Sequence, residues 1–147
     1  AARPKRILEV GTAVGFSALL MCEYNPEPCQ IITIENYEKR IPIARENFKK
    51  AGKEGQIELL EGDAAKILPT LTEPFDFIFM DPPYRMDLPK KVLEALKDTC
   101  LAEEETLIIA EEALDVDFSW AGALGYEIVK IKEYKTNIHV FLKIKEV

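Results

Sequence analysis

The sequence predicts an α/β domain built on a mostly parallel sheet of seven strands, with the last strand antiparallel. Over most of the chain, short apolar segments of strand length alternate with segments of helical spacing. The last two strand-like segments follow each other directly and read as a hairpin. The chain has 147 residues, no internal repeat and no linker, so we expect one domain over 1–147.

The first five predicted strands are rich in Ile, Leu, Val and Phe, as strands buried on both faces of a parallel sheet are. We expect these strands over residues 6–10, 31–34, 57–60, 75–80 and 106–110. Apolar residues at helical spacing predict helices between them. These helices are expected over residues 16–24, 41–51, 64–71 and 88–101, with a short ambiguous turn of helix over 118–124.

The C-terminal hairpin is predicted from alternating apolar and charged residues over 126–134 and 139–145, joined by Lys135-Thr136-Asn137. His139 lies in this pattern without an acid partner at a recognisable spacing, and we interpret it as structural. The hairpin lysines form either a basic face or an ordinary solvated sheet face. They are Lys130, Lys132, Lys135, Lys143 and Lys145.

The composition, with 48% hydrophobic and 31% charged residues, indicates a globular protein. We expect no membrane span, because charges interrupt every apolar stretch longer than a strand. The three cysteines form no Cys-x-x-Cys pair and accompany a single histidine, so we expect no metal site and free thiols in a reducing cytoplasm. The net charge of −7 argues mildly against a strong nucleic-acid footprint, although a local basic patch would supply one.

The first strand runs into a glycine loop, Glu9-x-Gly11-x-x-x-Gly15, just before a predicted helix. Glycines allow a tight turn and a close approach of the backbone to a ligand. The loop departs from the dinucleotide fingerprint because Ala13 and Phe16 replace its second and third glycines. A ligand without phosphate is therefore favoured over a pyrophosphate, and an ordinary tight turn is the alternative.

Acidic residues end the next two predicted strands. Glu35 lies 24 positions after Gly11, close to the offset of about 20 residues at which an acid reaches ribose hydroxyls. An ordinary exposed acid is the alternative for Glu35. Asp63 is placed to accept a hydrogen bond from the exocyclic amine of an adenine or to cap the helix that begins at Ala64, and the two roles are compatible.

The fourth strand ends at Asp81-Pro82-Pro83-Tyr84. Two prolines end a strand abruptly and leave carbonyl oxygens exposed in a stiff turn. A carboxylate, a carbonyl and an aromatic ring at a strand end suit a planar amino group, with acceptors for its N–H donors and a ring for stacking. A proline-capped strand with an incidental tyrosine is the alternative. Because polar groups follow four successive strands, we predict a nucleoside cofactor site.

With these four strand ends, nearly the whole chain resembles the class I S-adenosylmethionine-dependent methyltransferases. The resemblance implies a Rossmann-like three-layer sandwich and S-adenosyl-L-methionine as cofactor. In that family the loop holds the amino-acid part of the cofactor, the acid after the second strand binds ribose, and the residues after the third bind adenine. The implied cofactor-binding residues are Glu9, Gly11, Thr12, Ala13, Gly15, Glu35, Asn36, Asp63, Ala64 and Asp81, and the implied catalytic residues are Asp81, Pro82, Pro83 and Tyr84.

Two branches of the family are represented. The segment 7–80, with its sequence Leu-Glu-Val-Gly-Thr-Ala-Val-Gly-Phe-Ser-Ala, resembles the caffeoyl-CoA-type O-methyltransferases of small molecules and tRNA. Those enzymes carry Asp-Ala-Ala-Lys where this chain has Asp-Pro-Pro-Tyr. From Asp81 onward, including the hairpin over 134–141, the chain is similar to the small-subunit ribosomal RNA guanine-N2 methyltransferases.

The main functional prediction is methyl transfer to an exocyclic amino nitrogen of a nucleic-acid base, namely guanine N2 in ribosomal RNA. Asp81 and the Pro82 carbonyl would accept hydrogen bonds from the amino group, and Tyr84 would stack on the base. The partner is then ribosomal RNA or a small-subunit particle. The alternatives are O-methylation of a small molecule or tRNA, and a trimmed or recombined cofactor-binding domain that is inactive on its own.

Overall fold

The computed structural model describes residues 3–26, 28–81 and 87–145. The strands within these residues are β1 (Arg6–Val10), β2 (Gln30–Glu35), β3 (Ile57–Glu61), β4 (Phe77–Met80), β5 (Leu107–Ala113), β6 (Tyr126–Glu133) and β7 (Asn137–Ile144). The α-helices are α1 (Phe16–Tyr24), α2 (Ile41–Lys50), α3 (Ala64–Ile67) and α4 (Leu88–Lys97), and the 3-10 helices are η1 (Leu68–Thr70) and η2 (Ser119–Leu124).

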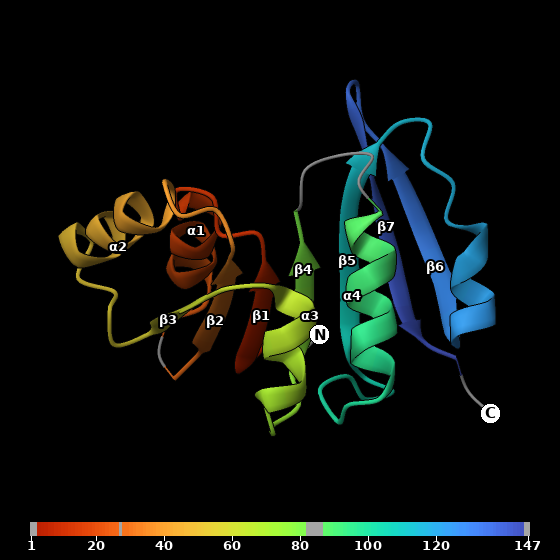
Figure 1. Ribbon diagram of the computed structural model, residues 1–147, viewed down its shortest axis with the longest axis horizontal. Helices are drawn as coiled ribbons and strands as arrows, with labels where there is room; N and C mark the ends of the chain where they lie inside the picture. Colours follow the sequence, from red (N-terminus) through yellow and green to blue (C-terminus); the bar gives the residue numbers. More distant parts are fainter. Residues whose placement is uncertain (1–2, 27, 82–86, 146–147) are drawn as a thin grey trace.

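The strands form one sheet in the order β3-β2-β1-β4-β5-β7-β6 (Figure 1). Neighbouring strands from β3 to β5 pair in parallel, and β7 runs antiparallel to both β5 and β6. The chain winds outward from β1 to β3 and then returns to β4 on the other side of β1. The predicted fold class is confirmed, and the crevice at the carboxyl ends of β1 and β4 is the switch point at which such sheets bind ligands.

Helices cover the sheet in two layers (Figure 1). On one face, Val92, Leu93 and Leu96 of α4 pack with buried residues of β1, β2, β4, β5 and β7. On the other face, Ala18 of α1 and Phe48 of α2 pack against buried residues of β1, β2 and β3. This second layer lies over β1–β3, and it places the N-termini of α1 and α2 beside the crevice.

Several element boundaries differ from the prediction, and three of the differences have a clear structural setting. β4 begins at Phe77, and the Phe75 N–H donates instead to the Leu101 carbonyl after α4. α4 ends at Lys97, and the chain turns before Leu101. β5 continues to Ala113, past the predicted end at residue 110, because β7 pairs with its last residues.

The β6–β7 hairpin contains a register shift between Ile128 and Lys130. Beyond the shift, Lys130 pairs with Phe141 and Lys132 pairs with His139. The Lys130 ammonium lies 5.4 Å from the centroid of the Phe141 ring. This part of the sheet face therefore combines lysines and partly exposed aromatic rings.

No helix in the described part of the chain is long and apolar enough to span a membrane. Cys22 and Cys29 are buried, Cys100 is exposed, and all three are free thiols.

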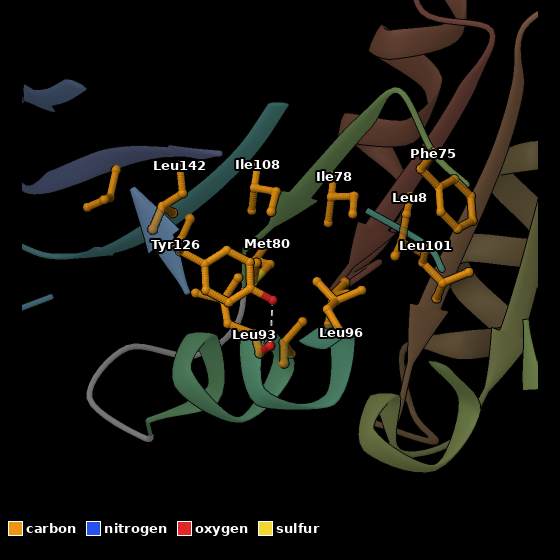
Figure 2. Close-up of a cluster of buried hydrophobic side chains, with 14 of the residues drawn as sticks. Leu8, Phe75, Ile78, Met80, Leu93, Leu96, Leu101, Ile108, Tyr126 and Leu142 are labelled. Atoms are coloured by element: carbon orange, nitrogen blue, oxygen red, sulfur yellow. Dashed lines mark hydrogen bonds between the residues drawn. The ribbon is translucent and has the colours of Figure 1, made fainter. Parts of the chain in front are cut away.

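One buried hydrogen bond ties the hairpin to the core. The Tyr126 hydroxyl donates to the Leu93 carbonyl of α4 over 2.6 Å, as Figure 2 shows. Burial raises the pKa of Tyr126 to about 12, because a charged phenolate would be poorly solvated there. The contact fixes the start of β6 against the helix that covers β4 and β5.

We expect Tyr126→Phe to lower the free energy of unfolding by about 1–2 kcal/mol, because it removes a buried donor from an otherwise unchanged ring. Urea unfolding would measure the change. Tyr24→Phe is the matched control, since the Tyr24 side chain is largely exposed, and it should alter stability by less than about 0.5 kcal/mol. Equal effects of the two variants would contradict the assigned contribution of the hydrogen bond.

Candidate functional site

Two adjoining cavities open at the carboxyl ends of β1, β2, β3 and β4. The first measures about 400 Å³ and is lined by Val10, Gly11, Ile34, Glu35, Asn36, Tyr37, Gly62, Asp63, Ala64, Ala65, Leu88 and Val92. The second measures about 330 Å³ and is lined by Gly11, Ala13, Glu35, Tyr37, Arg40 and Asp81. Gly11, Glu35, Asp63 and Asp81, predicted at four strand ends, therefore lie around two cavities that share part of their lining.

The loop after β1 passes through left-handed backbone conformations at Gly11 (φ 103°), Ala13 (φ 52°) and Gly15 (φ 93°). A Cβ atom on Gly15 would lie 2.5 Å from Cε1 of Phe48. Gly15 is thus required by its φ angle and by close packing on α2, and it lines neither cavity. Gly11 lines both, as its predicted approach to a ligand requires.

The Glu35 carboxylate is buried and binds the loop. Its Oε1 accepts from the Ala13 N–H over 2.6 Å, and its Oε2 accepts from the N–H groups of Asn36 and Tyr37 over 3.0 Å each. A carboxylate has about four acceptor positions. About one is left for a ligand, so the two hydroxyls of a ribose would share it or displace the Ala13 N–H.

Glu9 is fully buried beside two threonines. The Thr33 hydroxyl donates to Glu9 Oε1 over 2.6 Å, and the Thr12 and Thr33 hydroxyls are 2.6 Å apart. The Thr12 side chain is therefore engaged in a hydrogen bond with β2. Neither Thr12 nor Glu9 lines either cavity. Glu9 Oε2 is buried without a hydrogen-bond partner among the described residues.

The pKa of Glu9 is raised to about 8, chiefly by burial and further by the negative charges of Asp81 and Glu35. The carboxyl is thus mostly neutral at pH 7 and carries an unsatisfied oxygen. A buried polar atom of this kind is costly unless a partner is supplied. A ligand ammonium group would supply one and would also favour the ionised carboxylate.

Asp63 and Ala64 begin α3 at the edge of the first cavity. Asp63 Oδ1 accepts from the Ala65 N–H over 3.0 Å, which confirms the predicted N-cap. Val92 and Leu88 of α4 add apolar surface to the same cavity. This combination of an apolar wall with a carboxylate edge fits a purine ring that carries an amino group.

Asp81 follows β4, is half-buried and lines the second cavity. Burial, followed by the charge and hydrogen bond of Glu111, raises the pKa of Asp81 to about 6. The other predicted catalytic residues, Pro82, Pro83 and Tyr84, lie outside the described residues, so their roles stay predictions. Of the motif Asp81-Pro82-Pro83-Tyr84, Asp81 is therefore the residue whose position the structure describes.

Several residues of this region were not anticipated from the sequence. Tyr37 lines both cavities, and the Arg40 guanidinium lies 5.3 Å from the centroid of its ring. The sequence signal that could have identified Tyr37 and Arg40 as cavity residues is their position two and five residues after Glu35. His139 has no acid at a recognisable sequence spacing, but the β5–β7 register places its Nε2 3.9 Å from Glu111 Oε2.

The described residues contain no group of three or more His, Cys, Asp or Glu side chains placed to hold a metal ion. The acidic side chains at this edge come from neighbouring strands, and Glu35 is engaged in the contacts given above. The arrangement suits a cationic organic ligand with hydrogen-bond donors.

Comparison with known proteins places the chain among methyltransferases. Residues 2–110 match the O-methyltransferase family. A catechol O-methyltransferase of Niastella koreensis is 40% identical over 87 residues, which cover 54% of this chain and 39% of that protein. A tRNA1(Val) (adenine(37)-N6)-methyltransferase of Haemophilus influenzae is 32% identical over 80 residues, which cover 54% of this chain and 34% of that protein. The aligned regions therefore span about two-fifths or less of these relatives.

Solved structures share the fold over most of their length. The Podospora anserina methyltransferase PaMTH1, bound to SAH, superposes with a TM-score of 0.78 and 24% identity, over 97% of this chain and 73% of that one. The O-methyltransferase TomG of Streptomyces achromogenes, in complex with SAM, superposes with a TM-score of 0.75 and 23% identity, over 98% of this chain and 74% of that one. These ligand-bound neighbours support the predicted cofactor, S-adenosylmethionine. Since the family match extends over well more than half of the sequence, the chain belongs to the O-methyltransferase family.

Proposed function

We propose that this methyltransferase transfers a methyl group from S-adenosylmethionine to a hydroxyl oxygen of a small molecule. The observation that carries the proposal is the position of Asp81, a half-buried carboxylate that opens onto the second cavity within the segment matched to O-methyltransferases. The catechol O-methyltransferases among the relatives support a small hydroxylated acceptor. The comparisons thus favour the alternative over the main prediction, methylation of guanine N2 in ribosomal RNA.

The first cavity fits the adenosyl part of the cofactor. Leu88 and Val92 supply apolar contact, while Asp63 lies at the edge for the adenine amino group. Glu35 has about one acceptor position for a ribose hydroxyl. Glu9 lines neither cavity. We assign the ammonium of the amino-acid part to its unpartnered Oε2, because the family resemblance implies that the loop holds this part of the cofactor.

When bound, S-adenosylmethionine supplies an electrophilic methyl group on a positively charged sulfur and leaves as a neutral thioether that keeps the electron pair of the broken S–C bond. The acceptor oxygen gains this methyl group and loses its proton. We assign the removal of that proton to Asp81, because its carboxylate faces the cavity and its raised pKa makes it a stronger base than an ordinary aspartate. The fixed loop and the cavity walls contribute by holding the reactants in line.

A second candidate function is methylation of an exocyclic amino nitrogen of an RNA base. Two observations favour it: Asp81 is followed by Pro82-Pro83-Tyr84, and tRNA adenine-N6 methyltransferases are among the relatives. In this case the Asp81 carboxylate would accept a hydrogen bond from the amino group. The expected partner would be single-stranded or locally disrupted RNA, since the base has to leave a duplex to reach the cavity.

A transfer assay with radiolabelled methyl donor distinguishes the candidates. We expect label to enter catechol or a related phenol as a methyl ether, identified by mass spectrometry. Label entering transcribed tRNA or ribosomal RNA as N-methyladenine or N-methylguanine would support the second candidate and reject the first. Cofactor binding by calorimetry without transfer to any acceptor would support the hypothesis of a binding domain inactive on its own.

Asp81→Asn should lower kcat by about 10²–10⁴-fold, because the amide keeps the size of the carboxylate but cannot accept the acceptor's proton. Cofactor affinity should change far less, since the first cavity is untouched. Steady-state kinetics and calorimetry would measure both quantities. Asp98→Asn, which changes an exposed aspartate on the far end of α4, is the control. An active Asp81→Asn enzyme would refute the role of this carboxylate.

The raised pKa of Glu9 predicts that cofactor binding depends on pH. The carboxyl is protonated below about pH 8 in the free protein, and a bound ammonium favours its ionised form, so binding should release about one proton at pH 7. Affinity should then rise between pH 6 and 7.5, by up to about tenfold per pH unit. Calorimetry in buffers of different ionisation enthalpy would measure the released proton.

Glu9→Gln should abolish this proton release and weaken binding, whereas Glu58→Gln, which changes an exposed acid on β3, should preserve both.

The pH dependence of protein stability provides a second measurement of the pKa of Glu9. Because the pKa of Glu9 rises from 4.5 to about 8 on folding, the folded protein binds the extra proton, and wild-type stability falls as pH rises through this interval. Glu9→Gln should lack that fall. Unchanged proton release in this variant would exclude Glu9 as its source.

A further inference from the structure

Three polar side chains lie in a row across adjacent strands at the edge of the second cavity. Asp81 follows β4, Glu111 lies on β5 and His139 on β7. Met80 pairs with Ala110, so the next residues of β4 and β5, Asp81 and Glu111, are neighbours, and Glu111 pairs with His139. The sheet register therefore generates the row.

The contacts within this row lead from the cavity toward solvent. When one of the two is protonated, the Asp81 and Glu111 carboxyl groups share a hydrogen bond. His139 Nε2 lies 3.9 Å from Glu111 Oε2, and the exposed fractions of the His139 and Glu111 side chains are 26% and 17%. The Tyr134 ring lies against the imidazole, with centroids 4.7 Å apart. The imidazole is thus held at the solvent end of the row.

The charges around Asp81 favour proton uptake. Glu9 on β1, Glu35 on β2 and Glu111 on β5 are acids near it, while Arg40 is a cation in the wall of the same cavity. Burial and Glu111 together raise the pKa of Asp81 to about 6. At neutral pH such a carboxylate is still ionised and binds a proton more strongly than an ordinary aspartate. On the side of His139, the facing groups are Glu111 on β5 and Lys132 on β6.

We propose that Glu111 is a positioning residue, which shares the acceptor's proton with Asp81 in a hydrogen bond and passes that proton toward His139 and solvent. This inference rests on the proposed O-methyl transfer. The acceptor O–H bond breaks, and its proton goes to a carboxylate oxygen of Asp81 while its electron pair forms the bond to the methyl carbon. The proton is then shared between Asp81 and Glu111, and solvent water carries it across the 3.9 Å that separate Glu111 from the imidazole. No oxidant or reductant is needed.

Glu111→Gln tests the relay, because it keeps the size of the side chain but removes the charge and the second proton-binding site. In wild type, kcat/KM should rise through about pH 6 as Asp81 ionises. In the variant the rise should occur about one pH unit lower, and kcat at pH 8 should fall about tenfold. Glu127→Gln, which removes an exposed carboxylate from β6, should leave the profile unchanged.

The titration of Asp81 is measurable in the free protein, without turnover. Carbon NMR of protein labelled at aspartate, with the Asp81 signal identified from Asp81→Asn, should give a midpoint near pH 6 in wild type. Glu111→Gln should lower it. An unchanged midpoint would overturn the inference whether or not an acceptor has been found.

His139→Ala tests the exit of the proton. We expect kcat to fall about tenfold and to recover when imidazole is added, because a soluble base replaces the missing ring. Lys132→Ala, at the register partner of His139, should show neither effect.

Failure of the inference and failure of the proposed function give different results. If wild type methylates a phenol but neither variant changes the pH profile or responds to imidazole, the relay is overturned and the O-methyl transfer stands. If wild type methylates no hydroxyl acceptor, both are overturned.

Discussion

The site depends on one buried carboxylate that joins the ends of two strands. Glu35, at the end of β2, accepts hydrogen bonds from the Ala13 N–H of the β1 loop and from two N–H groups of its own loop. The N–H groups of Gly11 and Thr12 bond in turn to the Ile34 carbonyl. Because Glu35 lines both cavities, this clamp sets their common wall and fixes the loop in place before any ligand arrives.

Acids project from four adjacent strands at this edge: Glu9 on β1, Glu35 on β2, Asp81 after β4 and Glu111 on β5. Their mutual repulsion adds to burial in raising the pKa values of Glu9 and Asp81. Such an edge disfavours a pyrophosphate and favours a ligand that carries positive charge. The departures of Ala13 and Phe16 from the dinucleotide fingerprint point to the same class of ligand. Loop sequence and site electrostatics therefore agree.

Much of this arrangement was predictable, because it follows from local sequence. The strand ends at Glu35 and Asp63 were marked by apolar runs that stop at an acid, and the cap made by Asp63 depends only on residues next to it. Parallel strands bring their carboxyl ends to one edge, so the meeting of these acids needed no knowledge of distant contacts. Thr12 was assigned to the ligand because the family resemblance implies it, and Gly15 because of the glycine spacing as well. The structure shows the Thr12 hydroxyl hydrogen-bonded to Thr33 and Gly15 packed against Phe48.

What sequence reasoning missed depends on pairing between distant segments. Leu88 and Val92 reach the first cavity because α4 packs across the sheet, and their spacing shows only that one helix face is apolar. His139 has no acid near it in sequence, and its neighbour Glu111 is defined by the antiparallel register of β5 and β7. That register also extends β5 beyond its predicted end. The reversed last strand thus does more than complete the sheet, since it brings a solvent-accessible imidazole beside the buried acids and gives their protons a route out.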